Sequence, residues 1–249
     1  MLTAILFIFG LAIGSFINVV VLRLHANRSL SGRSECFSCH KQLKWHHNIP
    51  VLSFSILKGK CAWCQEKISW QYPLVELGTA VLLALGGLFG KSSDVSWLIA
   101  YALLVFFAVA LFVYDYKWQL LPDILSYGGA GTMLVINIWR GLDWHNLVVG
   151  ALVVSGFFLI QYLFSQGTWL GLGDVILGLF IGLSLGWPYV VIALMLAYWL
   201  GALTAIGLLL LKKRGWKSQI PFGTFLTLAT VATFIWGEPI LNWYMKFIS

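Results

Sequence analysis

Charged residues are absent from long stretches of the chain, and these stretches have the length of membrane-spanning helices. A spanning helix needs about 20 apolar residues. The uncharged or nearly uncharged stretches are 2–22, 73–90, 95–114, 124–139, 147–165, 175–211 and 218–237. The stretch 175–211 is too long for one helix, and Trp187-Pro188 divides it, because proline interrupts a continuing helix. The pattern therefore predicts an all-α polytopic membrane protein with about eight transmembrane helices.

The composition supports this class of protein. Hydrophobic residues make up 60% of the 249 positions and charged residues only 10%, against roughly 25% charged residues in soluble domains. A disordered chain, a fibrous repeat and an ordinary soluble enzyme are excluded. We expect a first transmembrane helix at 1–22, a polar loop domain at 23–72 and a membrane domain of seven helices at 73–249.

Lys and Arg residues give the predicted orientation. Thirteen of the 16 fall in loops on one side, eight of them in the 23–72 loop. Cytosolic loops carry such an excess, so we expect this loop in the cytosol and both chain termini on the opposite side of the membrane. The net charge of +7 follows mostly from this bias and requires no nucleic acid partner.

All four cysteines lie in the 23–72 loop, as the pairs Cys36/Cys39 and Cys61/Cys64. The spacing between the two Cys-x2-Cys pairs is close to that of four-cysteine zinc sites, in which two pairs of thiolates surround one ion. Iron accepts the same ligands. Two disulfides are the alternative, which the reducing cytosol disfavours. We predict a structural zinc site, because a small loop domain buries too little core to fold unaided.

Four of the nine acidic residues lie at predicted cytosolic ends of spans: Glu76, Asp115, Asp123 and Asp174. Asp115 closes its helix, where the helix dipole disfavours a negative charge, so capping does not explain it. Asp123 is interpreted as the N-cap of the next helix, and an N-cap is also the alternative for Asp174. Because the chain alternates direction, Asp115 and Asp174 are expected at the same membrane face.

Two carboxylates that meet at a membrane face suggest an aspartic-protease pair. When they lie close together, repulsion keeps one of them protonated. The ionised carboxylate accepts a proton from water while the neutral one polarises the scissile carbonyl, and the pair titrates as a unit. Gly171 and Gly173 beside Asp174 would allow substrate to approach the backbone closely.

Several stretches resemble the bacterial type IV prepilin peptidases, which belong to the GxGD intramembrane aspartic proteases. They are Gly14-Ser-Phe-Ile-Asn18 with Arg23, the cysteine loop with Asn48-Ile-Pro-Val-Leu-Ser53, Tyr72-Pro-Leu-Val-Glu76, Asp115 through Asp123, Gly171-Leu-Gly-Asp174, and Ile220-Pro-Phe-Gly223. The resemblance follows nearly the whole chain in order.

The resemblance implies a bifunctional enzyme of the bacterial inner membrane. Its catalytic residues would be Asp115 and Asp174. They would cleave the basic leader of prepilins or type II secretion pseudopilins on the cytosolic side, after a glycine and just before an apolar helix. A second activity would then methylate the new N-terminus with S-adenosylmethionine.

In the family the methyltransferase activity is associated with the amino-terminal half. The resemblance therefore makes Gly14, Asn18, Arg23 and Glu76 candidates for cofactor binding, with Arg23 as the expected partner of Glu76. No glycine-rich nucleotide loop follows a strand in this sequence. The alternative for Asn18 is a hydrogen bond to a neighbouring helix, and the alternative for Arg23 is snorkelling at a helix end.

Two other functions compete with this interpretation. One is a peptidase without methyltransferase activity, against which the cysteine loop argues. The other is a non-enzymatic membrane scaffold or transporter whose carboxylates bind ions. Carboxylates at the bilayer midplane would favour it, whereas Asp115 and Asp174 are expected at the face that a soluble leader reaches.

Overall fold

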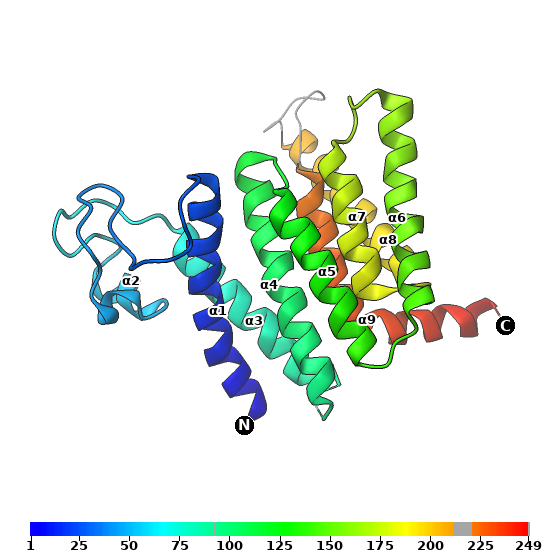
Figure 1. Cartoon of the computed structure of the whole chain (residues 1–249), viewed down its shortest axis with the longest axis horizontal. Coiled ribbons are helices and arrows are strands. Elements are labelled where there is room, and N and C mark those ends of the chain that lie inside the picture. The colour runs from blue at the N-terminus through cyan, green and yellow to red at the C-terminus, as the bar shows by residue number, and fades with distance from the viewer. Residues whose placement is uncertain (92, 212–220, 249) are drawn as a thin grey trace. The chain divides into compact units, whose positions relative to one another are not determined.

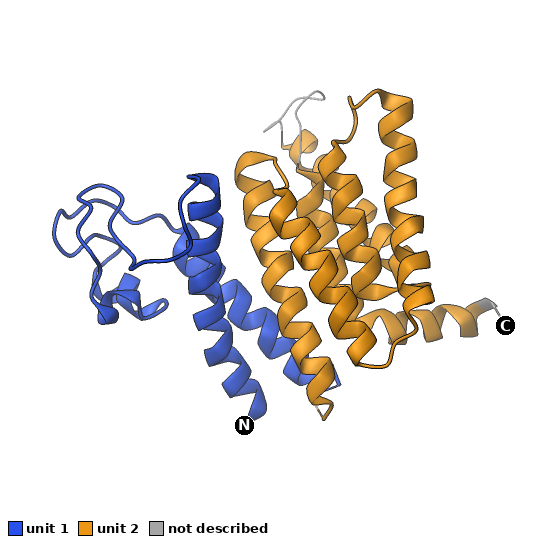
Figure 2. Ribbon diagram, viewed as in Figure 1, with its two compact units in different colours: residues 1–92 blue, residues 93–249 orange. Residues whose placement is uncertain are grey.

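The chain folds into two compact helical units, residues 1–92 and 93–249 (Figure 2). The computed structural model describes residues 1–91, 93–211 and 221–248. The basic residues of 212–217, which contribute to the predicted orientation, and Ile220 of the prepilin-peptidase resemblance lie outside the described residues. The first helix, the cysteine loop and the helix that follows it make up unit 1.

The helices follow the predicted spans closely (Figure 1). They are α1 (Leu2–His25), α2 (Leu52–Ile56), α3 (Gln71–Phe89), α4 (Val95–Trp118), α5 (Asp123–Trp139), α6 (Trp144–Ser165), α7 (Leu172–Leu185), α8 (Tyr189–Leu210) and α9 (Phe222–Ile248), with a 3-10 turn at Trp45–Asn48. The predicted break at Trp187-Pro188 is confirmed, because it separates α7 from α8.

Within the described residues, six helices are long and apolar enough to cross a membrane: α1, α3, α4, α6, α8 and α9. Helix α7 is apolar but shorter. At 1.5 Å per residue its 14 residues extend about 21 Å, against a hydrocarbon core of about 30 Å. The prediction of an all-α chain with several spans is confirmed, whereas the count of eight crossings stays a prediction.

Helices α1 and α3 of unit 1 pack together through small residues. A Cβ atom added to Gly10 would lie 2.5 Å from Cα of Ala80, and one added to Gly14 would lie 2.6 Å from Cα of Glu76. Glycines spaced four apart let two membrane helices approach closely. The backbone of Gly14 therefore lies directly against the turn of α3 that carries Glu76.

Unit 2 is built around α7 and α9. Helix α7 packs against α5, α6 and α9, and α9 also packs against α4 and α8. The α7 side chains Leu177, Phe180 and Ile181 are completely buried. This arrangement places the start of α7 and the start of α9 at the same end of unit 2 as the end of α4 (Figure 1).

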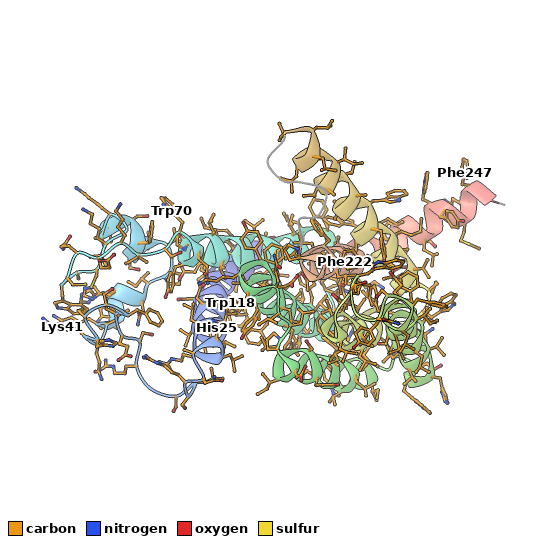
Figure 3. All side chains as sticks on the ribbon, turned by 90° about the horizontal axis from the view of Figure 1, so that it is seen from above. His25, Lys41, Trp70, Trp118, Phe222 and Phe247 are labelled. Carbon is orange, nitrogen blue, oxygen red and sulfur yellow. The ribbon has the colours of Figure 1, made fainter. Side chains whose placement is uncertain are left out.

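Two helix ends differ from the sequence prediction. Helix α9 continues past Gly237 to Ile248 with Pro239 inside it, and its last turns leave the direction of the helix as an arm that carries Phe247 (Figures 1 and 3). A proline inside a helix removes one backbone hydrogen bond and bends it.

Asp123 is the first residue of α5 and makes no side-chain cap, since Pro122 occupies the N-cap position. Its interpretation as the N-cap is wrong.

We expect Gly10→Leu to destabilise unit 1, because its side chain would force α1 away from Ala80. Overpacked sites typically lose about 1–3 kcal/mol. Gly78→Leu is the matched control, since a Cβ atom at this α3 position has nothing within 4 Å. Thermal unfolding in detergent and limited proteolysis of the 23–72 loop measure the difference. Equal stability of the two variants would contradict the tight α1–α3 contact.

Candidate functional site

Asp115 lies in the last turn of α4 and is 6% exposed. Its Oδ2 atom accepts a hydrogen bond of 2.8 Å from the backbone N–H of Thr224, and the N–H of Gly223 also donates to this carboxylate. Both amides belong to the first turn of α9, whose N-terminal dipole attracts a negative charge. The start of α9 therefore stabilises the Asp115 carboxylate, which the C-terminal end of α4 disfavours.

Gly223 makes this contact possible. A Cβ atom at Gly223 would lie 2.8 Å from Oδ2 and 3.2 Å from Cγ of Asp115. A Cβ atom at this position would displace the Asp115 carboxylate, so glycine lets the α9 backbone approach it. The sequence contained a signal in Pro221-Phe222-Gly223, but the role of the Gly223 and Thr224 amides was not predicted.

Asp174 lies in the first turn of α7 and is half-buried. Its Oδ2 atom accepts a hydrogen bond of 3.2 Å from the N–H of Gly171, the N-cap residue. The N-cap alternative for Asp174 is thus corrected. The residue occupies the third helical position, and its carboxylate reaches back to the helix start. Among the described residues, the other carboxylate oxygen of Asp174 accepts no hydrogen bond.

The charges of Asp115 and Asp174 lie near enough to repel each other. The side chain of Leu121 packs between the two helix starts, because Cβ atoms at Gly173 and Gly223 would lie 3.1 and 3.4 Å from it. Asp123 is exposed. The structure therefore brings Asp115 and Asp174 to one site in unit 2, with Leu121 between the backbones that hold them.

The four cysteines of unit 1 also form a cluster. Their Sγ atoms all lie within 4.8 Å of one another, and those of Cys36 and Cys64 are 3.8 Å apart. All four are free thiols. Four sulfurs bound tetrahedrally to zinc at about 2.3 Å would be spaced by about 3.8 Å. The cluster therefore fits a tetrahedral metal ion better than it fits two disulfides.

The two Cys-x2-Cys turns have the same backbone geometry. The N–H of Cys36 donates to the carbonyl of Lys41, and the N–H of Cys61 donates to the carbonyl of Glu66. Hydrogen bonds from the backbone N–H groups of Cys64 and Trp63 lower the pKa of the Cys61 thiol to about 6. A thiolate is the form that binds metal, and the second turn favours it at Cys61, whereas burial and hydrogen bonds with the other cysteines raise the pKa of Cys64 to about 12.

The histidines near the cluster do not belong to its four-sulfur shell. His40 and His46 are exposed, whereas His47 is partly buried. The rings of His46 and His47 meet edge to face, and His47 makes the same contact with Trp63. Burial, followed by the nearby His46 and Lys44, lowers the pKa of His47. These aromatic contacts support the second cysteine turn from outside.

Three polar residues of α1 and α3 are partnered within unit 1. Asn18 donates to the carbonyl of Tyr72 at 3.2 Å. Glu76 is 6% exposed and accepts a hydrogen bond of 2.8 Å from the N–H of Val51. Arg23 donates to five carbonyls of 29–33. The predicted pairing of Arg23 with Glu76 is wrong, because a backbone amide satisfies Glu76 and the loop backbone surrounds Arg23.

The fold and these residues define a polytopic membrane protein with a carboxylate pair in one unit and a four-cysteine cluster in the other. Residues 8–88 match the family model described as the Bacterial Peptidase A24 N-terminal domain, and residues 102–206 match that of the Type IV leader peptidase family. The chain belongs to this family of bacterial type IV prepilin peptidases.

Relatives match nearly the whole chain. A protein of Aeromonas hydrophila is 33% identical over 97% of this chain and 93% of its own length. A protein of Aeromonas salmonicida is 32% identical over 98% of this chain and 94% of its own length. A protein of Bacillus subtilis is 30% identical over 98% of this chain and 98% of its own length. Each is named prepilin leader peptidase/N-methyltransferase. No solved structure matches the chain.

Replacing Cys36 and Cys39 together with serine should abolish metal binding, because two of the four thiolates are lost. His40→Ala is the matched control, since His40 follows Cys39 directly but supplies no sulfur. Metal content of the purified protein, measured by mass spectrometry, distinguishes the two. Unchanged metal in the serine variant would rule out the four-sulfur site.

Proposed function

We propose that this protein is a bifunctional enzyme of the bacterial inner membrane that cleaves prepilins or type II secretion pseudopilins and then methylates the new N-terminus. The observation that carries the peptidase activity is the placement of Asp115, which the amides of α9 hold within electrostatic reach of Asp174. The names of the full-length relatives support both activities.

The peptidase step follows from two carboxylates that share one proton. The ionised carboxylate takes a proton from water, and the water oxygen adds to the scissile carbonyl, which the neutral carboxyl polarises. The C–N bond then breaks, and a proton passes to the leaving amine. The products are a leader with a free carboxylate and a mature chain with a new amine. Neither role is assigned to one aspartate, because the pair titrates as a unit.

The position of the pair suits a substrate with a basic leader and an apolar helix. Asp115 ends one candidate span and Asp174 begins the short helix α7. With the 23–72 loop in the cytosol, both aspartates lie at the cytosolic membrane face. The substrate's apolar helix would stay in the lipid bilayer, while its leader would reach the aspartates from the cytosol.

Unit 1 is assigned the methyl transfer, with Gly14, Asn18, Arg23 and Glu76 at or near the site and zinc as the structural ion of the cysteine cluster. S-adenosylmethionine would supply the methyl group for the new amine. The polar atoms of Asn18, Arg23 and Glu76 are already bonded within the chain. These bonds favour a role in holding the loop over direct contact with the cofactor, and the methyl-transfer step itself is not assigned to these residues.

A non-enzymatic ion-binding scaffold is the competing function. An ion site would need several oxygen ligands converging on one point. Amide N–H groups instead occupy the Asp115 carboxylate, and such donors repel a cation. This arrangement favours the peptidase.

Asp115→Asn and Asp174→Asn should each lower prepilin cleavage by about 100-fold or more, because neither variant retains a carboxylate pair to transfer protons. Asp123→Asn is the matched control and should retain most activity, since Asp123 is exposed on α5. Cleavage of a purified prepilin, followed by mass, measures all three. Normal processing by Asp115→Asn or Asp174→Asn would refute the pair.

Gly223→Ala should lower cleavage by about tenfold or more, because its methyl group displaces the Asp115 carboxylate and small displacements of reacting groups are costly. Gly131→Ala in α5 is the control, since a Cβ atom there has nothing within 4 Å. The same cleavage assay applies, with thermal unfolding to show that both variants are folded. Equal activity would mean that the α9 amides do not position Asp115.

A further inference from the structure

The polar residues of α1 and α3 hold three different segments of the cysteine loop. Arg23 binds the segment that leaves α1, through carbonyls that include those of Leu30 and Ser31, both at 2.7 Å. Asn18 binds the segment that enters α3, where it bonds to Gln71 and Tyr72. His25 and Trp70 mark these two ends of the loop in Figure 3.

Glu76 holds the middle of the loop. Its Oε2 atom accepts the N–H of Val51 at 2.8 Å, although 25 residues separate the two in sequence. The carboxylate also accepts a hydrogen bond from the Ser15 side chain. A buried carboxylate needs such donors, because burial removes its water. Glu76 is therefore the point at which α3 and the middle of the loop are joined.

The backbone at Val51 is strained. Val51 has φ 61° and ψ −45°, and the N–H of Leu52 donates to the carbonyl of Pro50 at 2.6 Å, which closes a three-residue γ-turn. A β-branched residue rarely adopts a positive φ, and such a conformation persists only where its surroundings impose it. The hydrogen bond from the Val51 amide to Glu76 is the contact that fixes this turn to α3.

We infer that Glu76 is a positioning residue for the methyl transfer, which clamps the strained turn at Val51 and so docks the cysteine loop on α1 and α3. The inference rests on the proposed methyltransferase activity of unit 1. The clamp requires a hydrogen-bond acceptor at position 76, but it does not require a negative charge there. A direct ligand of the cofactor's cationic groups would instead require the charge.

Four variants test the clamp. Glu76→Gln keeps an acceptor oxygen for the Val51 amide but removes the charge, and Glu76→Ala removes both. Val51→Gly removes the strain, since glycine adopts positive φ readily. The fourth variant combines Glu76→Ala with Val51→Gly, and Glu66→Ala is the control because Glu66 is an exposed glutamate of the same loop.

Three readouts are measured: methylation of a mature pilin with labelled S-adenosylmethionine, proteolysis of the loop, and hydrogen exchange at the Val51 amide. Glu76→Ala should lower methylation by about tenfold or more, open the loop to protease and speed amide exchange. Glu76→Gln should stay close to the wild type in all three. Val51→Gly should restore part of the loop protection and methylation that Glu76→Ala loses.

Other results would overturn the clamp. If Glu76→Gln loses methylation as fully as Glu76→Ala while the loop stays protected, Glu76 acts through its charge at the cofactor. If glycine at position 51 restores nothing, the strained turn is not what Glu76 supports. If the wild-type protein does not methylate, the proposed function fails, whereas proteolysis and amide exchange still decide the clamp.

Discussion

The structure depends on the need to give every buried carboxylate a hydrogen-bond donor. Water is scarce near the membrane core, and an unpaired buried charge is costly. The chain meets this need twice in the same way, with a backbone amide from a distant segment. Thr224 donates to Asp115, and Val51 donates to Glu76. Because neither amide carries a charge, it fixes the position of the carboxylate without forming an ion pair that would neutralise it.

Glycine makes both arrangements possible. Gly223 lets the first turn of α9 reach Asp115, and Gly14 lets α1 reach the backbone of Glu76. In each case a methyl group would occupy the space beside the carboxylate-bearing residue. Gly223 and Gly14, which the sequence analysis took from the family resemblance, therefore both have a packing role in the structure. Gly14 contributes by letting α1 and α3 lie close together.

The sequence predicted the helices well, because the absence of charge along a span is a strong local signal. It also grouped the four cysteines correctly, since paired spacing brings thiolates together through short turns. It failed for Arg23 and Glu76, where pairing by opposite charge was the simplest expectation. Both side chains instead bond to the backbone of the loop. Every residue has such backbone groups, so the residue types in the sequence do not reveal these hydrogen bonds. The α9 amides that hold Asp115 were missed for the same reason.

The two proposed activities place different demands on these units. Cleavage needs two carboxylates at a fixed separation, which rigid helices such as α4, α7 and α9 provide. Methylation needs a site that admits both a soluble cofactor and the amine that cleavage creates, and this amine stays attached to an apolar helix in the bilayer. A metal-stabilised loop docked on membrane helices can face the cytosol and still remain at the membrane surface. Under the proposed function, the contacts of Asn18, Arg23 and Glu76 with the loop would act on methylation by holding the loop in place.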